Sequence, residues 1–319
     1  MKNIRYVVDS QSDSSLTTDL TGMAGDIVGG LTSILSLVNH DTIHTSVSAG
    51  EENNNGYRAW IKGVISSTKH DSDDKLDYSY KFLSKRLVLG ADKILEDGGV
   101  LGAFYQYTDG ELKCDGDRND NTDHGIALRG SFNLTDQIGM VSAGAFARSN
   151  VKGDSLPSGK TINSVNIYNA LNYTAKVGDF FLVKPKVGIE YMNINRKKYS
   201  NKDGLELKGL MISLWDAYTG LSLKSTAKIN DFTYRIKLFG DLYHNIASSK
   251  SSVCVIIPQE NVVTEVEEGI KLRSKTRWSL GTSFGLWYMD RYKVKSSYTY
   301  SRIDKDVTHI GTLTFAIEF

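Results

Sequence analysis

The residue types that could do chemistry are few in this 319-residue chain and lie far apart in it. His44 and Ser46 form a His-x-Ser tripeptide, in which an imidazole could act as a base for a hydroxyl nucleophile. This tripeptide lies in a polar connection, and a single tripeptide does not identify a catalytic site. Cys114 and Cys254 have no metal-ligand spacing, and no other cluster of metal-ligand residues stands out. We therefore expect a protein that is not an enzyme and that holds no cofactor and no metal.

The composition excludes several classes of protein. The chain carries 38 Lys and Arg against 37 Asp and Glu, a net charge of +1, so no overall field would attract nucleic acid. No run of about 18 apolar residues is present that could make a membrane-spanning helix. The chain has only 3 Pro, together with 17 Tyr, 11 Phe and 4 Trp, and this composition favours strands. We expect a protein rich in β-structure with no nucleic-acid partner.

One segment near the N-terminus has helical periodicity. Its apolar residues recur every three or four positions between residues 16 and 39, but four glycines would each cost about 1 kcal/mol in a helix interior. Such a helix needs a close-fitting surround. Residues 1–15 have a basic start without the apolar region of a signal peptide, and residues 48–55 have the composition of a linker. The apolar helix positions are Met23, Ile27, Leu31, Ile34, Leu35 and Val38.

From residue 57 onward the hydrophobicity alternates with a period of two. Leu128 and its apolar neighbours fall on one face of a strand, while Arg129 falls on the other, and the pattern recurs in many segments of ten or more residues. A water-soluble sandwich would have shorter strands and an apolar inner face. Charges on one face therefore indicate a polar interior, where we expect them to be solvated. Arg129 should then tolerate replacement, unless it pairs with Asp19 or Asp26 of the N-terminal helical segment. The expected interior charges are Lys62, Arg129, Lys184, Glu190, Arg235 and Asp241.

The pattern predicts twelve strands whose connections alternate between tight turns and long polar loops. Short turns at one end and long loops at the other are typical of outer-membrane β-barrels, in which closure gives every backbone amide a partner. The fold class that we predict is all-β: a 12-stranded antiparallel transmembrane β-barrel, which is wide enough to hold one α-helix in its lumen. The expected strands are 57–66, 82–94, 99–108, 124–134, 138–150, 164–175, 180–194, 211–225, 232–245, 276–288, 291–302 and 307–319.

Several of these segments resemble motifs of the C-terminal β-domain of autotransporters (type Va secretion), particularly the rickettsial surface-antigen type. Residues 56–63, GYRAWIKG, are similar to the first strand after the linker, and residues 87–112 are similar to a "GxD" hairpin followed by a glycine-containing strand. Residues 182–191 match a strand with Pro-x-x-Gly-x-x-Tyr spacing, which accounts for Pro185 in a central strand, where proline would otherwise be unfavourable. The C-terminal residues resemble the signal read by the barrel-assembly machinery. These signal positions are Leu313, Phe315, Ile317 and Phe319.

The resemblance implies a domain division and a function. Residues 1–15 would be a disordered remnant, residues 16–55 an N-terminal α-helix in the lumen, the pore helix, with its linker, and residues 56–319 the barrel. The interior charges would then contact the helix and water; the alternative for the helix is a soluble amphipathic cap or a remnant outside the barrel. The domain would be a monomeric translocator and anchor in the cell outer membrane that exports and displays an N-terminal passenger, an adhesin. Its partners would be the lipid bilayer, the barrel-assembly machinery, periplasmic chaperones and its own passenger. The alternatives are a stand-alone porin, a small loop-borne adhesin, or a soluble β-protein.

The Asn-Asn pair and the two cysteines each allow two interpretations. Some autotransporters cleave themselves at an Asn-Asn bond, and the pair Asn53-Asn54 could serve as such a site, although its position favours a flexible linker. Cys114 and Cys254 both fall in expected extracellular loops, where a disulfide could persist, and two free thiols are the alternative.

Overall fold

The computed structural model describes most of the chain after residue 55, and the side chains of residues 251–270 and of a few strand ends are left out of the description. The expected helix of residues 16–39 and the linker after it lie outside the described residues. Within the described part of the chain, no helix has the length and apolar character needed to cross a membrane. The described residues are 56–70, 79–114, 117–153, 160–178, 180–196, 199–200, 206–207, 210–248, 251–259, 262–270, 276–303 and 306–319.

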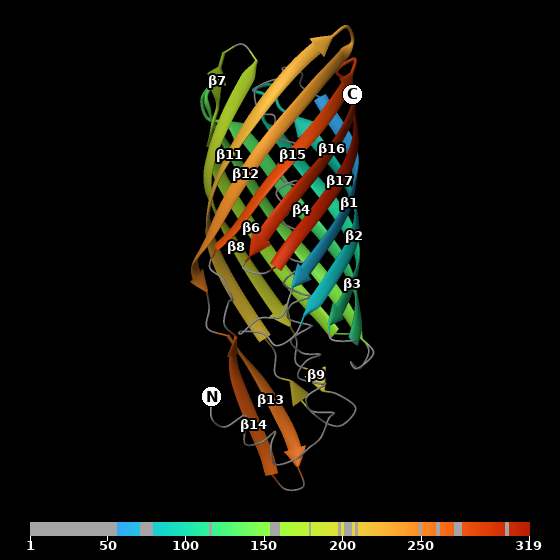
Figure 1. The fold of residues 1–319 in the computed structure, drawn as a ribbon, viewed down its shortest axis with the longest axis vertical. Helices are drawn as coiled ribbons and strands as arrows, with labels where there is room; N and C mark the ends of the chain where they lie inside the picture. The colour runs from blue at the N-terminus through green and yellow to red at the C-terminus, as the bar shows by residue number, and fades with distance from the viewer. Residues whose placement is uncertain are drawn as a thin grey trace.

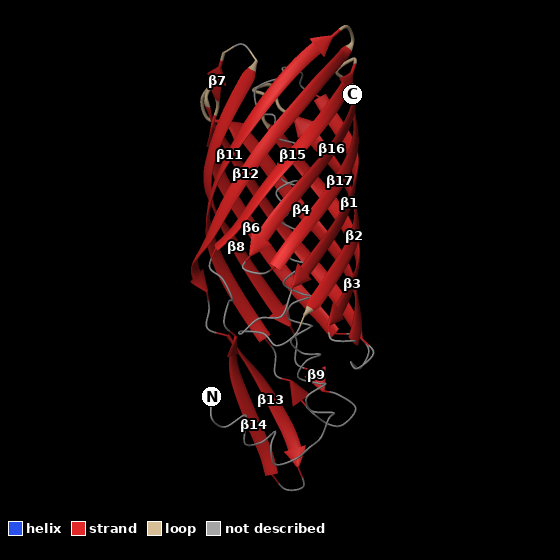
Figure 2. Cartoon of the chain, in the orientation of Figure 1, coloured by secondary structure: helices blue, strands red, loops and turns tan. Residues whose placement is uncertain are grey.

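Twelve long strands form a closed antiparallel barrel (Figures 1 and 2). Each strand pairs with the next along the chain, and the last strand pairs with the first from Arg58↔Glu318 to Lys69↔Val307, which closes the barrel. The predicted fold class is confirmed for the barrel. Its strands are β1 (Gly56–His70), β2 (Tyr80–Ile94), β3 (Val100–Cys114), β4 (Asp117–Asn133), β5 (Ile138–Gly153), β6 (Lys160–Tyr173), β8 (Phe181–Arg196), β11 (Leu210–Ile229), β12 (Phe232–Ser248), β15 (Thr276–Tyr288), β16 (Tyr292–Ile303) and β17 (Asp306–Glu318).

All twelve expected strands are present, but many extend further toward the long loops than the sequence predicted. The start of β4 is the clearest case, because residues 117–123 (DRNDNTD) are polar at every position and were expected to be part of a loop. They pair with β3 on one side and, from Asn119 onward, with β5 on the other. Backbone pairing to two neighbours therefore outweighs the low strand propensity of these side chains.

The opposite end of the barrel consists of tight turns, and we call it the turn end. Asn230 joins β11 to β12 with φ of 53°, and Met289 and Asp290 join β15 to β16 with φ of 53° and 52°. Positive φ at two successive residues gives a turn whose twist matches that of the flanking strands. The other end, where the strands meet the long connections, is called the loop end.

Pro185 lies in the middle of β8, at a break in the neighbouring strand. On one side it pairs with Leu221 of β11. On the other side, β6 pairs with β8 as far as Lys186, and the short strand β7 (Ala175–Val177) resumes the pairing at Val183. Among the described residues no partner faces Pro185 on that side, so its missing N–H removes no ladder bond.

The two connections expected as polar loops at 195–210 and 247–275 contain strands, which corrects the sequence analysis. Strands β9 (Tyr199–Ser200), β10 (Glu206–Leu207), β13 (Ser251–Gln259) and β14 (Val262–Ile270) pair into a second sheet in the order β14-β13-β10-β9. The β13–β14 hairpin extends beyond the loop end of the barrel (Figure 1). Its runs of Val and Ile have strand propensity, which a description of the whole connection as polar obscures.

The barrel is apolar outside and polar inside, the reverse of a water-soluble protein. Leu128 is 69% exposed on the outer face, and its neighbour Arg129 is 7% exposed on the inner face. Many other large apolar side chains are exposed on the outer face, including Ile126, Val187 and Leu280. Successive residues of a strand point to opposite faces, so this separation follows directly from the alternation in the sequence.

Candidate functional site: the charged turn end of the lumen

The candidate site is the inner wall of the barrel at the turn end, where charged side chains from many strands converge. The structure places all six predicted interior charges on the inner wall, four of them buried: Lys62, Arg129, Glu190 and Asp241. Lys184 and Arg235 line a space at the turn end. These charges divide into groups with different composition.

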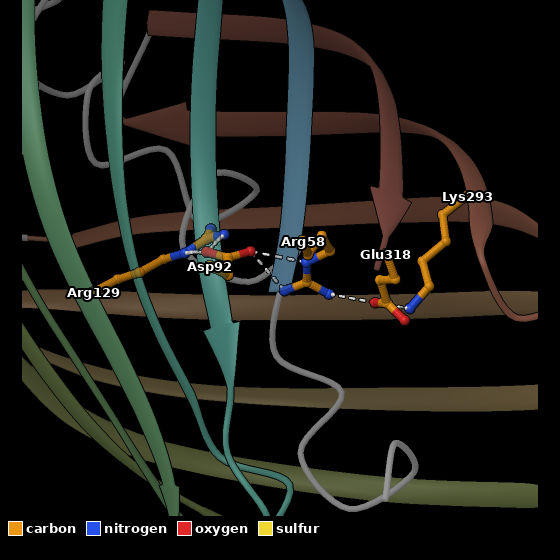
Figure 3. A network of polar contacts seen from close by, with 5 residues as sticks. All are labelled: Arg58, Asp92, Arg129, Lys293 and Glu318. Atoms are coloured by element: carbon orange, nitrogen blue, oxygen red, sulfur yellow. Dashed lines mark hydrogen bonds and ion pairs between the residues drawn. The ribbon is translucent and has the colours of Figure 1, made fainter. Parts of the chain in front are cut away.

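A network of five charged residues spans the closing seam of the barrel, and we call it the clasp (Figure 3). Arg58 of β1 donates from Nε to Asp92 Oδ2 of β2 at 2.8 Å, and its Nη2 lies 2.8 Å from the same oxygen as an ion pair. Arg129 of β4 donates to Oδ1 of the same carboxylate, with Nη2 at 2.6 Å and Nε at 3.1 Å. The Asp92 side chain is completely buried, so it depends on these two guanidinium groups for its charge balance.

The clasp continues across the seam to the last strand. Arg58 Nη1 lies 3.6 Å from Oε1 of Glu318 on β17, and Lys293 of β16 also pairs with Glu318. The carboxylate near the C-terminus thus connects with the first strand through Arg58. Backbone hydrogen bonds reinforce the same corner, because Tyr57 N donates to Phe319 O at 2.9 Å and Phe319 N donates to Tyr57 O at 3.0 Å.

The motif residues of the first three strands shape the clasp. Trp60 lies beneath Arg129, whose Cζ is 4.7 Å from the centre of the indole ring. A Cβ added at Gly90 would lie 2.1 Å from the Trp60 ring, and one added at Gly102 would lie 2.0 Å from Asp92 Oδ1. Glycine at these two positions therefore leaves room for the indole and the carboxylate.

The clasp corrects the expectation that Arg129 is a solvated charge. Arg129 is buried, bonded to Asp92 and stacked on an indole, so its replacement should be costly. Arg58 and Asp92 were not predicted as site residues, although both lie in the motifs at residues 56–63 and 87–112. The period-two alternation of hydrophobicity could have identified them, because Arg58 and Asp92 share the inner face with Lys62 and Arg129.

A second group of charges lines a space in the lumen that we call the basic chamber. Its cations come from β8, β11, β12 and β16, and residues of β5, β6 and β15 complete its lining. Among the described residues that line this space, none is acidic. Two of its cations lie over aromatic rings, Arg235 at 4.2 Å from Trp287 and Lys237 at 5.2 Å from Phe239. The chamber cations are Lys184, Lys186, Lys224, Arg235, Lys237 and Lys295.

A third group surrounds Glu190 and Asp241, further toward the loop end. Asn166 Nδ2 donates to Glu190 Oε1 at 2.9 Å, and Arg277 Nη2 lies 3.7 Å from Oε2. Tyr218 donates to Asp241 at 3.2 Å and stacks between Tyr168 and Tyr243. These two carboxylates thus have partners on the wall itself.

The structure describes only some of the other predicted site residues. Leu313, Phe315 and Phe319 are exposed on the outer face of β17, and Ile317 between them is partly buried. Cys114 ends β3 and Cys254 lies in β13, but their side chains are outside the described part. The helix positions from Met23 to Val38, His44, Ser46 and the pair Asn53-Asn54 lie outside the described residues. Within those residues no group of three His, Cys, Asp or Glu could hold a metal ion.

The chain matches the family model described as "Autotransporter beta-domain" over residues 59–255. No curated protein sequence matches it. Among solved structures, the translocator domain of autotransporter NalP from Neisseria meningitidis superposes with a TM-score of 0.66 at 9% identity, over 90% of this chain and 97% of that one. The β-domain of the Bordetella autotransporter BrkA superposes with a TM-score of 0.62 at 11% identity, over 83% of this chain and 100% of that one. The transport unit of the autotransporter AIDA-I from Escherichia coli superposes with a TM-score of 0.59 at 13% identity, over 88% of this chain and 98% of that one.

Proposed function

The chain belongs to the autotransporter β-domain family and is an outer-membrane translocator and anchor domain; from this premise we propose that it carries an N-terminal passenger, an adhesin, through its lumen to the cell surface. The observation that carries the proposal is the way the chain enters the barrel. Gly56 begins β1 at the turn end, so the preceding residues join the barrel at that end of the lumen. Short turns face the periplasm in outer-membrane barrels, and a passenger attached there would start on the periplasmic side.

The division of the chain follows from this role. We assign residues 56–319 to the barrel, residues 16–55 to a pore helix and linker, and residues 1–15 to a separate N-terminal segment. The apolar stripe from Met23 to Val38 and the glycines of the same segment suit a helix enclosed by a narrow lumen. The barrel is a transport domain, and we assign no catalytic step to it.

Assembly in the outer membrane would use the barrel-assembly machinery, with periplasmic chaperones holding the unfolded chain. The support for this partner is the outer face of β17, where Leu313, Phe315 and Phe319 are 44%, 49% and 67% exposed. Deletion of Phe319 should lower the amount of inserted barrel, measured as heat-modifiable protein on unboiled gels. Equal amounts of inserted barrel with and without Phe319 would contradict this assignment.

Surface display tests the function directly. A signal peptide and a reporter domain are placed before Met1, and protease is added to intact cells. We expect protease to remove the reporter while the barrel stays in the outer membrane as heat-modifiable protein. A matched variant with Asp92→Ala should display less reporter because closure of the barrel is weakened. A reporter that stays protected inside cells containing folded barrel would refute the translocator role for this chain.

A further inference from the structure

The outer face of strands β1 to β4 changes from apolar to charged as the strands approach the loop end. On β2, the exposed side chain of Leu87 is followed on the same face by Lys85 and Lys81. On β3, the exposed side chain of Tyr107 is followed by charged residues that end with Lys113. An outer-membrane barrel has an apolar outer band with the long loops outside the cell, so this charged part lies beyond the band on the outer side.

Aromatic side chains mark the level of this change. Oη of Tyr105 lies 2.7 Å from Nδ1 of His124, and Tyr107 packs edge-on against the same imidazole with 5.3 Å between ring centres. The arrangement recurs on β16 and β17, where Oη of Tyr298 lies 2.7 Å from Nδ1 of His309. Aromatic girdles of membrane barrels lie at the two interfaces between hydrocarbon and water. The cations beyond this girdle are therefore at the level of the lipid headgroups of the outer leaflet.

Four of these cations form a row across neighbouring strands. The antiparallel register places Lys69 of β1 opposite Lys81 of β2, and Lys81 opposite Lys113 of β3. Lys113 is in turn opposite Arg118 of β4, and all four side chains are exposed. Like charges that are directly opposite each other on one face of a sheet are destabilising. A row that lowers stability in this way favours a role in binding negative charge.

Carboxylates on the same face balance only part of the row. Glu111 lies 2.8 Å from both Lys113 and Arg118, and Asp120 lies 3.2 Å from Arg118. Asp109 is opposite Lys85 in the register. Toward the loop end, the described outer-face side chains of β1 to β4 thus comprise five cations and these three carboxylates, a net charge of +2. We call the five cations the basic rim: Lys69, Lys81, Lys85, Lys113 and Arg118.

The outer face of strands elsewhere in the barrel has a different composition at this end. The described outer-face side chains of β8, β11, β12 and β15 toward the loop end include no Lys, Arg, Asp or Glu. On β8 the face ends with Asn193 and Asn195, and on β12 it ends with His244 and Ile246. General attraction to a membrane surface would not require cations to be concentrated on a few adjacent strands. The basic rim therefore has the character of a site for a particular headgroup.

We propose that the basic rim binds the phosphate groups of a lipid headgroup in the outer leaflet, with Lys81 and Lys85 as the central contacts. A lysine ammonium is a compact charge with three donors on a flexible stem, which suits a phosphate at an exposed surface. The acyl chains of the lipid lie against Leu87 and Leu89, which are 44% and 46% exposed on the same face of β2. This inference rests on the outer-membrane location of the barrel and does not depend on export of a passenger.

Titration of the folded full-length chain in detergent with lipid A tests the proposal, because this outer-leaflet glycolipid carries phosphate groups. Native mass spectrometry measures the fraction of barrel with bound lipid. We expect Lys81→Gln with Lys85→Gln to weaken binding about tenfold, since lysines close to anionic headgroups contribute strongly to membrane binding. Lys176→Gln with Lys228→Gln is the matched control, because it removes two exposed charges near the turn end and should leave binding unchanged. Heat-modifiable migration on unboiled gels shows that each variant is folded.

The same titration identifies the source of the bound anion. Dephosphorylated lipid A should bind the unaltered chain about as weakly as lipid A binds the Lys81→Gln, Lys85→Gln variant. An excess of inorganic phosphate should displace little lipid A, because the acyl chains add contacts along β2. Equal binding of lipid A to this variant and the unaltered chain would overturn the proposal. Equal binding of the two lipid forms, or full displacement by inorganic phosphate, would overturn it as well.

Lysine acetylation locates the lipid without any substitution. Acetic anhydride modifies exposed lysine amines, and mass spectrometry after digestion gives the rate at each position. Lipid A should slow the acetylation of Lys81 and Lys85 severalfold and should leave the rate at Lys176 unchanged. Equal rates at Lys81 and Lys85 with and without lipid A would show that the lipid binds elsewhere and would contradict the assignment.

Discussion

The clasp and the basic chamber are neighbouring groups of charges at the turn end of one lumen, joined at β16 by Lys293 and Lys295, and they differ in the signs of the charges that they bring together. In the clasp, two carboxylates hold three cations, and Asp92 alone accepts from two arginines. In the chamber, six cations converge and no acidic residue is among the described lining. Burial of a charge is tolerated when a partner is fixed beside it. The clasp therefore has the composition of a structural device, whereas the described lining of the chamber carries charges of one sign only.

The position of the clasp agrees with a structural role. Its residues come from β4, β2, β1, β17 and β16, so it spans the pairing of the first strand with the last (Figure 3). This closing pair must form between segments more than 200 residues apart in the sequence. Ion pairs at one end of the seam favour a single register for that closure.

Removal of Asp92, the central carboxylate of the clasp, should give the largest loss of stability. We expect Asp92→Ala to lower the free energy of unfolding by about 3–5 kcal/mol, because two buried guanidinium groups lose their partner. Urea unfolding of the barrel in lipid vesicles measures the change. Lys228→Ala is the matched control, since its ion pair with Asp290 at 3.4 Å is exposed and should contribute under about 1 kcal/mol. Similar losses in the two variants would show that the clasp contributes no more than a surface pair.

A cation introduced on the outer face, next to Arg129 of the clasp, tests whether the surroundings of a charge decide its effect on stability. Leu128→Arg should destabilise the barrel by about 2–4 kcal/mol, because this position is 69% exposed toward the lipid and has no carboxylate partner. The same unfolding measurement in vesicles applies, with Leu128→Met as the apolar control. If Leu128→Arg had no effect, the assignment of the outer face to lipid would fail.

The close fit of Gly102 against Asp92 provides a subtler probe of the clasp. Gly102→Ala should cost about 1–3 kcal/mol, because the new Cβ would lie 2.0 Å from Asp92 Oδ1 unless the carboxylate shifts. Combining it with Asp92→Ala should cost less than the two single losses together, since the clash disappears with the carboxylate. Strict additivity in this double-mutant cycle would mean that the two residues do not interact.

The chamber should give the smallest change in stability. Lys237→Gln removes one member of the cross-strand pair with Lys224, and relief of repulsion offsets the loss of contact with Phe239, so we expect a change below about 1 kcal/mol in either direction. Unfolding under the conditions used for Asp92→Ala checks this. A loss of stability comparable to that of Asp92→Ala would place Lys237 in a structural network like the clasp. The clasp and the chamber would then not differ in their contribution to stability.

Some features of this barrel could be read from local sequence, and others could not. The period-two alternation located all twelve strands and assigned Leu128 and Arg129 to opposite faces. The strand at residues 117–123 was missed because seven polar residues show no alternation in hydrophobicity, and its pairing depends on β3 and β5. The β13–β14 hairpin was missed because its Val and Ile residues lie within a long connection that was treated as one polar loop.

The sequence alone determined which residues face inward, because the side-chain direction in a strand depends only on position along the strand. It also determined where the tight turns fall and how many strands alternate with them. The partners of the inward charges depend on closure, which brings Arg58 beside Glu318 and leaves Lys224 beside Lys237. Those neighbours come from strands whose register is set by backbone pairing around the whole ring. The tertiary structure therefore decided that Arg58 meets a carboxylate across the closing seam while Lys224 and Lys237 lie side by side.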